Sequence, residues 1–446
     1  MPIAAVGVAV FFLYLFGLTR TGMLSADEPR YAAIGRAMAA TGDWVTPRLW
    51  EQPWFEKPAL LYWMTAAGFK LGLDEDLAPR LPVALAAIGF LIFFWWWLRR
   101  EYGLRIACYA TAILATSAGW LAYSHVAVTD LPLSVCFAAA MLFVAGGKPL
   151  PAGLLLGLAI LAKGLVPLVL FLPAVWYLWR PPRRLAWILG VAVLVAAPWY
   201  ILVTLRNGTV FLNEFFVKHH FQRFATGALQ HERPFWFYLP VLLAAIFPWT
   251  PLIVGLFRRP IYDGRRERFL LAWVIFGLVF FSLSRNKLPG YLLPLLPALA
   301  ILLALALVEI RNAALILALT GALLGLIPAI ADALPQALAA GASHVHLQFH
   351  YWILAPVILF GGFLWWLDAR GRRDWAMGAL AAAMTVLVAL VVWNTYPVLD
   401  HTVSARGYWR EHQREGVPCT GNTSRSWRYG LDYYAGKVVP NCNHAP

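Results

Sequence analysis

The residues of this chain best suited to chemistry stand together in its first polar stretch. An acidic pair leads the run Asp27-Glu28-Pro29-Arg30-Tyr31, and a second acid–base pair, Glu56-Lys57, follows. The stretch begins where the apolar run 3–18 ends. Charge held beside hydrocarbon is costly and is usually retained for a function. Asp27 is therefore the first candidate for a general base or a substrate ligand at the membrane rim.

Each of these groups also has an ordinary structural interpretation. Asp27 and Glu28 could cap a helix that begins near Pro29 and support its dipole, and Glu56-Lys57 could be a simple interfacial ion pair. One cap does not require two acids, however. Lys57 also directly precedes Pro58 at the start of an apolar stretch, where an ammonium can meet a lipid phosphate.

Two more charged residues lie within otherwise apolar sequence. Asp130 stands at the predicted outer end of a span, where it could simply cap the helix around Pro132. Lys163 separates the apolar runs 149–162 and 165–179. A lysine this enclosed by hydrocarbon favours a functional role.

A later polar segment, 205–235, contains adjacent histidines followed by an arginine. His220 and Arg223 are three residues apart and would share one face of a helix. His220 and Arg223 could bind a phosphate, or His220 could bind a metal ion together with a carboxylate. His219 would point in another direction, so the two histidines alone make a poor metal site.

A short predicted outer loop near residue 287 carries two cations, Arg285 and Lys287, against the usual topological bias. This favours an anion site. Gly290 would let the backbone approach a ligand closely, and Tyr291 follows it.

Five cations that lie near the membrane boundary are all predicted on the outer side of the membrane: Arg30, Lys57, Lys163, Arg223 and Lys287. Asp27 and Asp130 share that side. Cations stabilise the charge that grows on a departing phosphate, and a carboxylate can take a proton from an acceptor hydroxyl. The combination suits a reaction that expels a lipid phosphate.

The elements that must position these groups are membrane helices. The chain is 61% hydrophobic and 13% charged, with a mean hydropathy of +0.66, whereas a soluble domain carries about a quarter charged residues. The net charge of +14 is scattered between apolar runs. That pattern excludes a nucleic-acid patch and favours topology-setting loops and membrane lipids as partners.

Thirteen apolar segments are candidate spans: 3–19, 80–98, 104–122, 131–146, 149–163, 165–179, 185–204, 236–256, 269–284, 288–308, 312–331, 351–367 and 375–393. The fifth and sixth are short, and form either a tight pair or two half-helices broken at Lys163-Gly164. Arginine-rich short loops fall on one side, which the positive-inside rule makes cytoplasmic. Residues 20–79, 205–235 and 394–446 then face out.

The sequence therefore predicts an all-α integral membrane protein. A transmembrane catalytic domain, 1–393, carries short amphipathic helices in its first outer loop, one of them over Tyr31 to Met38. Residues 394–446 form a small outer cap. Cys419 and Cys442 lie in this cap, and a disulfide between them is plausible if the cap faces an oxidising compartment.

The ordered motifs resemble the GT-C glycosyltransferases, and most closely the aminoarabinose transferases that modify lipid A and their relatives among the protein O-mannosyltransferases. The resemblance covers about residues 20–300 and rests on eight motifs: Asp27-Glu28-Pro29-Arg30-Tyr31, Gly42-Asp43-Trp44, Phe55-Glu56-Lys57-Pro58, Thr129-Asp130-Leu131-Pro132, Ala162-Lys163-Gly164, His220-Phe221-Gln222-Arg223-Phe224, Pro234-Phe235-Trp236-Phe237-Tyr238 and Lys287-Leu288-Pro289-Gly290-Tyr291.

The resemblance implies a polyprenyl-phosphate (undecaprenyl-phosphate) sugar donor, a lipid A-like or other envelope acceptor, inversion at the sugar carbon and an active site on the periplasmic side of the bacterial inner membrane. By position, Asp27 and Asp130 are the expected catalytic acids. The expected substrate-binding residues are Glu28, Arg30, Tyr31, Lys57, Lys163, Arg223, Lys287 and Tyr291. Some relatives hold a divalent, zinc-like metal, which here would be bound by Glu56 with His220 or His219.

The chain departs from the aminoarabinose transferases in its short outer end, which leaves the acceptor open. A protein O-mannosyltransferase-like activity is the alternative within enzymes. A transporter or flippase for a lipid-linked sugar is the alternative from another class, although transporters gather charge near the midplane and often repeat their halves. A phosphate acceptor is already anionic, in which case Asp27 would orient the substrate and remove no proton.

Overall fold

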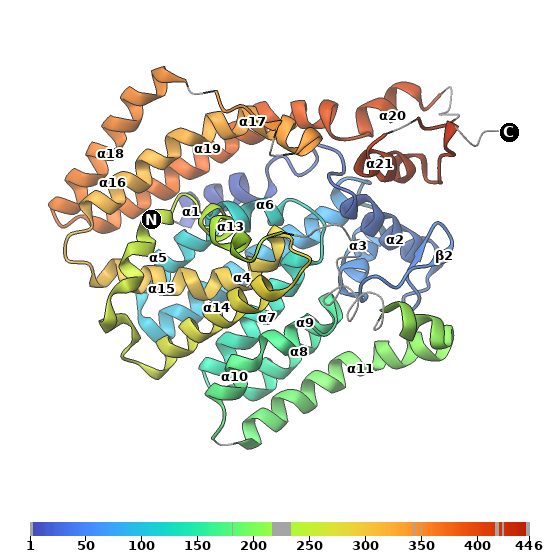
Figure 1. The fold of residues 1–446 in the computed structure, drawn as a ribbon, viewed down its shortest axis with the longest axis horizontal. Coiled ribbons are helices and arrows are strands. Elements are labelled where there is room, and N and C mark those ends of the chain that lie inside the picture. The colour runs from blue at the N-terminus through green and yellow to red at the C-terminus, as the bar shows by residue number, and fades with distance from the viewer. Residues whose placement is uncertain are drawn as a thin grey trace.

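The computed structural model describes residues 3–180, 182–215, 233–341, 344–348, 350–414, 419–421 and 423–442. This part of the chain is helical nearly throughout, which confirms the all-α prediction (Figure 1). In hydrocarbon every backbone N–H and C=O must be satisfied within its own segment, so apolar runs fold as helices. Each of the thirteen predicted spans overlaps a helix.

Six helical segments are long and apolar enough to cross a membrane, or up to eight if two bent pairs each count as one span. The six are α4 (Leu77–Tyr102), α11 (Pro182–Leu212), η6 with α15 (Pro289–Leu295, Leu296–Glu309), α16 with η7 and α17 (Ala314–Leu323, Leu324–Leu326, Ile327–Ala340), η9 with α18 (Tyr351–Ile353, Leu354–Ala369) and α19 (Arg373–Thr402).

The bent pairs are α5 with α6 (Leu104–Ala115, Ala118–Ser124), bent by 62°, and η3 and α13 with η4 (Phe235–Phe237, Tyr238–Ala245, Thr250–Phe257), bent by 112°. Shorter apolar helices are α1 with η1 (Ile3–Val10, Phe11–Leu15), α7 (Asp130–Ala145), α8 (Pro149–Lys163) and α9 with α10 (Val166–Leu170, Leu172–Tyr177). Between η5 (Arg259–Tyr262) and η6 lies α14 (Arg265–Leu283). The number of spans stays a prediction.

The chain breaks where the sequence indicated, at Lys163-Gly164. Lys163 is the last residue of α8, and Gly164 has a φ of 69°, a left-handed conformation that glycine adopts without strain. The short helices α9 and α10 follow. The break leaves the Lys163 ammonium at a helix end, where negative dipole charge favours a cation.

Two helices extend beyond the ends of the predicted apolar spans. The prediction ended one span at residue 204, but α11 continues to Leu212 across a kink at Gly208, whose φ is 61°. The prediction ended the last span at 393, but α19 continues to Thr402. Both extensions are bonded to the first outer segment, because Arg206 pairs with Asp43 and Asp400 accepts the backbone N–H of Gly22.

The first outer segment contains α2 (Asp27–Thr41), the antiparallel strands β1 (Arg48–Leu49) and β2 (Gln52–Pro53), and α3 (Leu60–Lys70). The predicted helix over Tyr31 to Met38 is confirmed as part of α2. Asp43 accepts the backbone N–H groups of Val45 and Thr46 and pairs with Arg206 of α11 at 2.8 Å. The Gly42-Asp43-Trp44 motif thus ends α2 and joins the loop to α11.

Arg80 of α4 fixes the start of this segment. Its side chain is fully buried, and it holds both carboxylate oxygens of Glu28 at 2.7 and 2.9 Å. Its other N–H groups donate to backbone carbonyls in the segment 18–22. Glu28 also accepts the backbone N–H groups of Leu24 and Ala127. The pair therefore joins α2, α4 and the segment before α7.

Replacing Arg80 with methionine is expected to lower the free energy of unfolding by about 3–5 kcal/mol, because Glu28 would stay buried without its partner. Thermal unfolding of the detergent-purified protein measures the loss. Arg105→Met is the matched control, since Arg105 pairs with Asp374 on the exposed surface, and should cost at most about 1 kcal/mol. Equal stability of the Arg80 variant and the wild type would contradict this structural role.

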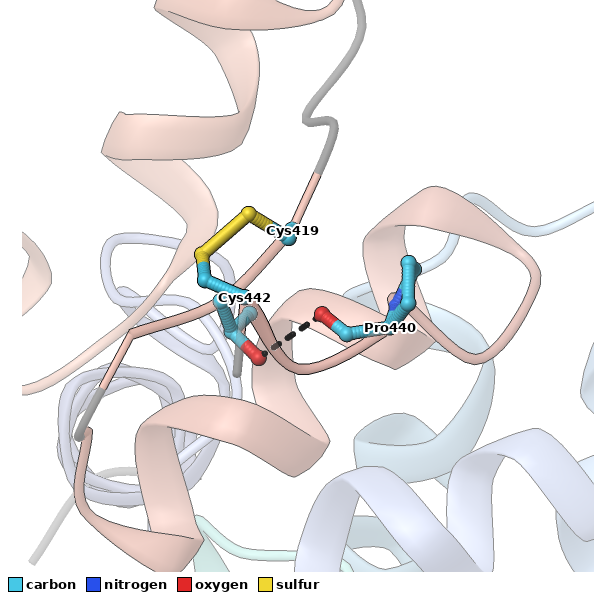
Figure 2. Close-up of a disulfide and its surroundings, with 4 residues drawn as sticks. Cys419, Pro440 and Cys442 are labelled. Atoms are coloured by element: carbon cyan, nitrogen blue, oxygen red, sulfur yellow. Dashed lines mark hydrogen bonds between the residues drawn. A yellow bond between two sulfur atoms is a disulfide. The ribbon is translucent and has the colours of Figure 1, made fainter. Parts of the chain in front are cut away.

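The outer cap contains α20 (Arg406–His412) and α21 (Arg425–Ala435). Cys419 and Cys442 form a disulfide with their Cα atoms 4.8 Å apart (Figure 2). Beside it, the Pro440 carbonyl accepts from the Thr420 hydroxyl at 3.3 Å and from the Thr420 backbone N–H at 2.7 Å. This bridge joins the two ends of the segment that carries α21.

The cap is attached to the first outer segment. Tyr434 accepts the backbone N–H of Met23 and donates to Asp76, both at 2.8 Å. Arg406 binds Asp76 at 2.5 Å and Asp400 at 2.7 Å. Figure 1 shows α21 beside α2 and α3, with the far end of α11 on their other side.

Candidate active site

Four charged side chains of the first outer segment form a continuous chain of contacts, here called the acid–arginine cluster: Asp27, Arg30, Glu56 and Lys57. Arg30 lies one helical turn after Asp27 and contacts its carboxylate. Arg30 Nη1 also donates to Glu56 Oε2 over 3.0 Å, and Lys57 Nζ lies 3.2 Å from Glu56 Oε1. The four residues that the sequence placed at the membrane rim therefore do meet.

Within this cluster, Asp27 is the member that faces solvent. Its side chain is 41% exposed, whereas that of Arg30 is 5% exposed. Burial disfavours the charged guanidinium, but the carboxylates of Glu56 and Asp27 more than offset this and raise the pKa of Arg30 above its ordinary value. Arg30 is thus a permanent cation that holds an accessible carboxylate in place.

A second pair lies at the ends of two membrane helices. Asp130 begins α7 and Lys163 ends α8, and Lys163 Nζ lies 2.7 Å from Asp130 Oδ1. The same ammonium lies 4.6 Å from the centre of the Tyr291 ring. A Cβ at Gly290 would come within 2.7 Å of Asp130 Oδ1, so glycine is required there. The predicted close approach at Gly290 is to this carboxylate.

Tyr123 of α6 lies beside the Asp130–Lys163 pair. A Cβ at Gly290 would come within 2.7 Å of the Tyr123 hydroxyl oxygen as well as of Asp130 Oδ1, so the two side chains meet at this glycine. The contact between Glu28 and the Ala127 N–H, at 2.9 Å, holds the start of α2 against the segment that leads to α7. The starts of α2 and α7, which carry the two predicted catalytic acids, are therefore held near each other.

Three residues predicted to bind substrate are instead buried in the supporting structure. Glu28 is occupied by Arg80, as described above. Tyr31 packs against Tyr62 with ring centres 5.8 Å apart, and burial, with the charges of Glu56 and Asp27, raises its pKa. Lys287 donates to the Ser284 carbonyl, and burial lowers its pKa. Direct contact of these three residues with substrate stays a prediction.

The metal prediction joins Glu56, which the structure describes, to a histidine that it does not describe. In the described ranges, no group of three or more His, Cys, Asp or Glu side chains could hold a metal ion. Glu56 already faces the two cations Arg30 and Lys57, whose charges oppose a divalent ion. His219, His220 and Arg223 lie outside the described residues. We derive no step through a metal, and that site stays a prediction.

Sequence reasoning missed several residues around the acid–arginine cluster. Trp54 and Tyr429 place their rings over the Arg30 guanidinium, and within the described part of the chain the buried Trp54 Nε1 has no hydrogen-bond partner. Arg80 could have been identified from the sequence. It lies at the start of an apolar run, where a charged side chain is costly, and the same cost singled out Lys163. Nothing local in the sequence indicates Tyr429.

No protein-family model matches the chain. It is 33% identical over 435 residues to the undecaprenyl phosphate-alpha-4-amino-4-deoxy-L-arabinose arabinosyl transferase of Serratia proteamaculans, covering 88% of this chain and 76% of that protein. It is 34% identical over 339 residues to the enzyme of the same name from Aeromonas salmonicida, covering 70% of this chain and 61% of that one.

Solved structures give the same result. ArnT from Cupriavidus metallidurans bound to undecaprenyl phosphate matches with a TM-score of 0.80 and 27% identity, over 98% of this chain and 85% of that one. The apo oligosaccharyltransferase of Archaeoglobus fulgidus matches with a TM-score of 0.53 and 13% identity, over 99% of this chain and 64% of that one. The second likeness concerns the fold alone.

Proposed function

This chain belongs to the family of undecaprenyl phosphate-α-4-amino-4-deoxy-L-arabinose arabinosyl transferases, and we propose that it moves 4-amino-4-deoxy-arabinose from undecaprenyl phosphate to a lipid A-like acceptor. As a member, it is a multi-pass membrane glycosyltransferase of the GT-C fold that uses a polyprenyl-phosphate-linked sugar. We propose the identity of the sugar, the identity of the acceptor and the location of the site at the periplasmic face of the inner membrane.

The observation that supports this proposal best is the joining of Asp27, Arg30, Glu56 and Lys57 in one cluster near the Asp130–Lys163 pair. In glycosyl transfer the acceptor oxygen forms a bond to the anomeric carbon while the bond from that carbon to the phosphate oxygen breaks. The phosphate leaves with the bonding electrons, and the ammonium groups of Lys57 and Lys163 would stabilise its charge.

Asp27 would act on the acceptor. A single displacement inverts the anomeric carbon and requires the acceptor and the phosphate on opposite faces of the sugar. If the acceptor is a hydroxyl, the exposed Asp27 carboxylate takes its proton. If the acceptor is a phosphate, it is already ionised, and Asp27 would position Arg30, whose guanidinium orients the acceptor. Both roles use the same geometry.

To test this proposal, the purified protein is reconstituted in liposomes, and sugar transfer is measured from a defined undecaprenyl-phosphate aminoarabinose donor. Lipid A, other envelope glycans and a serine-rich peptide are offered as acceptors. Mass spectrometry is expected to find lipid A heavier by one aminoarabinosyl group, with one undecaprenyl phosphate released for each transfer. Modified peptide would instead support the O-mannosyltransferase-like alternative. Movement of intact donor across the bilayer without release of undecaprenyl phosphate would support a flippase.

A further inference from the structure

We propose that Tyr429 of the cap is a positioning residue for Arg30, so that α21 completes the acid–arginine cluster. This inference deepens the proposed function and rests on it for its kinetic consequences. The observation is an aromatic cage around one buried cation. The guanidinium carbon of Arg30 lies 5.9 Å from the centre of the Tyr31 ring, 5.6 Å from that of Trp54 and 5.1 Å from that of Tyr429.

The cage complements the polar contacts of Arg30. Its guanidinium donates to Glu56, to Asp27 and, through Nε at 2.9 Å, to the Ala26 carbonyl. A guanidinium is planar and donates at its edge, so its faces remain for aromatic rings, which attract a cation through their π systems. This attraction is larger where water is excluded, and the Arg30 side chain is almost completely buried.

Tyr31 and Trp54 belong to the same outer segment as Arg30, but Tyr429 does not. Tyr429 reaches the cage only because α21 lies against α2. A second contact of the same kind lies farther along both helices, where Arg36 of α2 stands 4.1 Å from the centre of the Tyr433 ring. These two arginine–tyrosine contacts set the register between the helices.

The cap holds Tyr429 at this place through groups on the following turn of α21. Tyr433 donates to the Glu75 carbonyl at 2.7 Å, and Tyr434 donates to the Asp76 carboxylate at 2.8 Å. The disulfide between Cys419 and Cys442 joins the two ends of the segment that contains α21. The Tyr429 ring is therefore presented to Arg30 by a docked helix and is not a loose surface group.

Removal of the Tyr429 ring is expected to affect the position of the Asp27 carboxylate. Arg30 contacts both Asp27 and Glu56, and Asp27 is the exposed acid of the cluster. Without the Tyr429 ring, water would reach the guanidinium and weaken its hold on the Asp27 carboxylate. We expect slower transfer with unchanged donor binding, since the cations assigned to the donor phosphate are Lys57, which pairs with Glu56, and Lys163, which pairs with Asp130.

The experiment compares three variants of the full-length protein. Tyr429→Ala is expected to lower kcat about 10-fold, the factor that a desolvated cation–π contact supports, with KM for the donor within about twofold of wild type. Tyr429→Phe keeps the ring and should restore kcat. Tyr408→Ala is the matched control, because Tyr408 is a cap tyrosine that packs on Trp427 and His412 away from Arg30, and it should leave kcat unchanged.

A readout without substrate separates this inference from the proposed function. The rate at which phenylglyoxal modifies Arg30, followed by mass spectrometry of its peptide, should rise about 10-fold in Tyr429→Ala and stay at the wild-type value in Tyr429→Phe and Tyr408→Ala. A wild-type protein that transfers no sugar from the defined donor overturns the proposed function but leaves this comparison valid.

Three results would overturn the inference. The first is an unchanged rate of Arg30 modification in Tyr429→Ala. The second is a Tyr429→Phe variant as impaired as Tyr429→Ala, because the ring would then not be responsible. The third is equal damage by Tyr408→Ala, which would indicate general loosening of the cap.

Discussion

Replacing Asp27 with asparagine is expected to reduce sugar transfer by about 100-fold or more, the lower end of the range for losing a general base, while expression and folding stay normal. Asparagine has the same shape but no charge. Folding should not depend on that charge, since the Asp27 side chain is 41% exposed and makes its ion pair with Arg30 at the edge of the cluster. Initial rates with the purified variant in liposomes measure the loss.

Asp43→Asn is the matched control for this prediction. Asp43 is a carboxylate of the same outer segment, and an asparagine oxygen can still accept from the backbone N–H groups of Val45 and Thr46. We expect transfer within a few-fold of wild type, because the variant loses two partly exposed ion pairs, with Arg206 at 2.8 Å and with Arg48 at 3.9 Å. Near-native transfer by Asp27→Asn would remove Asp27 from the mechanism.

The kinetic constants of Asp27→Asn also distinguish its two possible roles. If Asp27 takes a proton from an acceptor hydroxyl, kcat falls and KM for the acceptor changes little. If Asp27 instead positions Arg30 toward an anionic acceptor, KM for the acceptor rises as well, because losing the Asp27 charge then weakens ground-state binding by Arg30. The same variant thus reports which acceptor chemistry the site performs.

Replacing Lys163 with methionine should have a comparably large effect, with transfer reduced by about 100-fold. Two losses combine in this variant. The leaving phosphate loses a cation near the bond that breaks, and Asp130 loses the partner at 2.7 Å that compensates its charge in a largely buried place. Steady-state rates at saturating donor, with thermal unfolding measured on the same preparation, record both losses.

Lys148→Met serves as the control, because Lys148 is exposed at the opposite end of α8 and should leave transfer unchanged. A swapped variant, Asp130→Lys with Lys163→Asp, separates the two losses. It restores an ion pair and should recover thermal stability, yet transfer should stay low because the charges have exchanged places. Full transfer by the swapped variant would show that the pair is only structural.

The sequence located most of the candidate site because the cost of charge near hydrocarbon is visible in a single segment. Asp27, Lys57, Asp130 and Lys163 stood out for this reason, and the structure brings them into the two neighbouring groups described above. The break at Lys163-Gly164 was readable for a similar reason, since a lysine followed by a glycine interrupts an apolar run. The roles of these residues in catalysis remain predictions for the variants above to test.

The sequence did not separate Glu28 from Asp27. Both acids lie in the first turn of α2, but neighbouring residues on a helix point about 100° apart. Glu28 turns inward to Arg80, and Asp27 turns outward with Arg30. Which direction is inward depends on where α4 passes, and residues 27–31 alone do not contain that information.

The amino-acid sequence by itself determined the helical fold with its apolar spans, and it selected Asp27, Lys57, Asp130 and Lys163 as candidate site residues. These follow from hydropathy and helical geometry, which act over about 20 residues or fewer. Only the tertiary structure decided which carboxylate meets which cation, how far α11 and α19 extend, and that Tyr429 stands over Arg30. Those outcomes depend on contacts between segments distant in the chain, whose partners are set by the packing of the whole molecule.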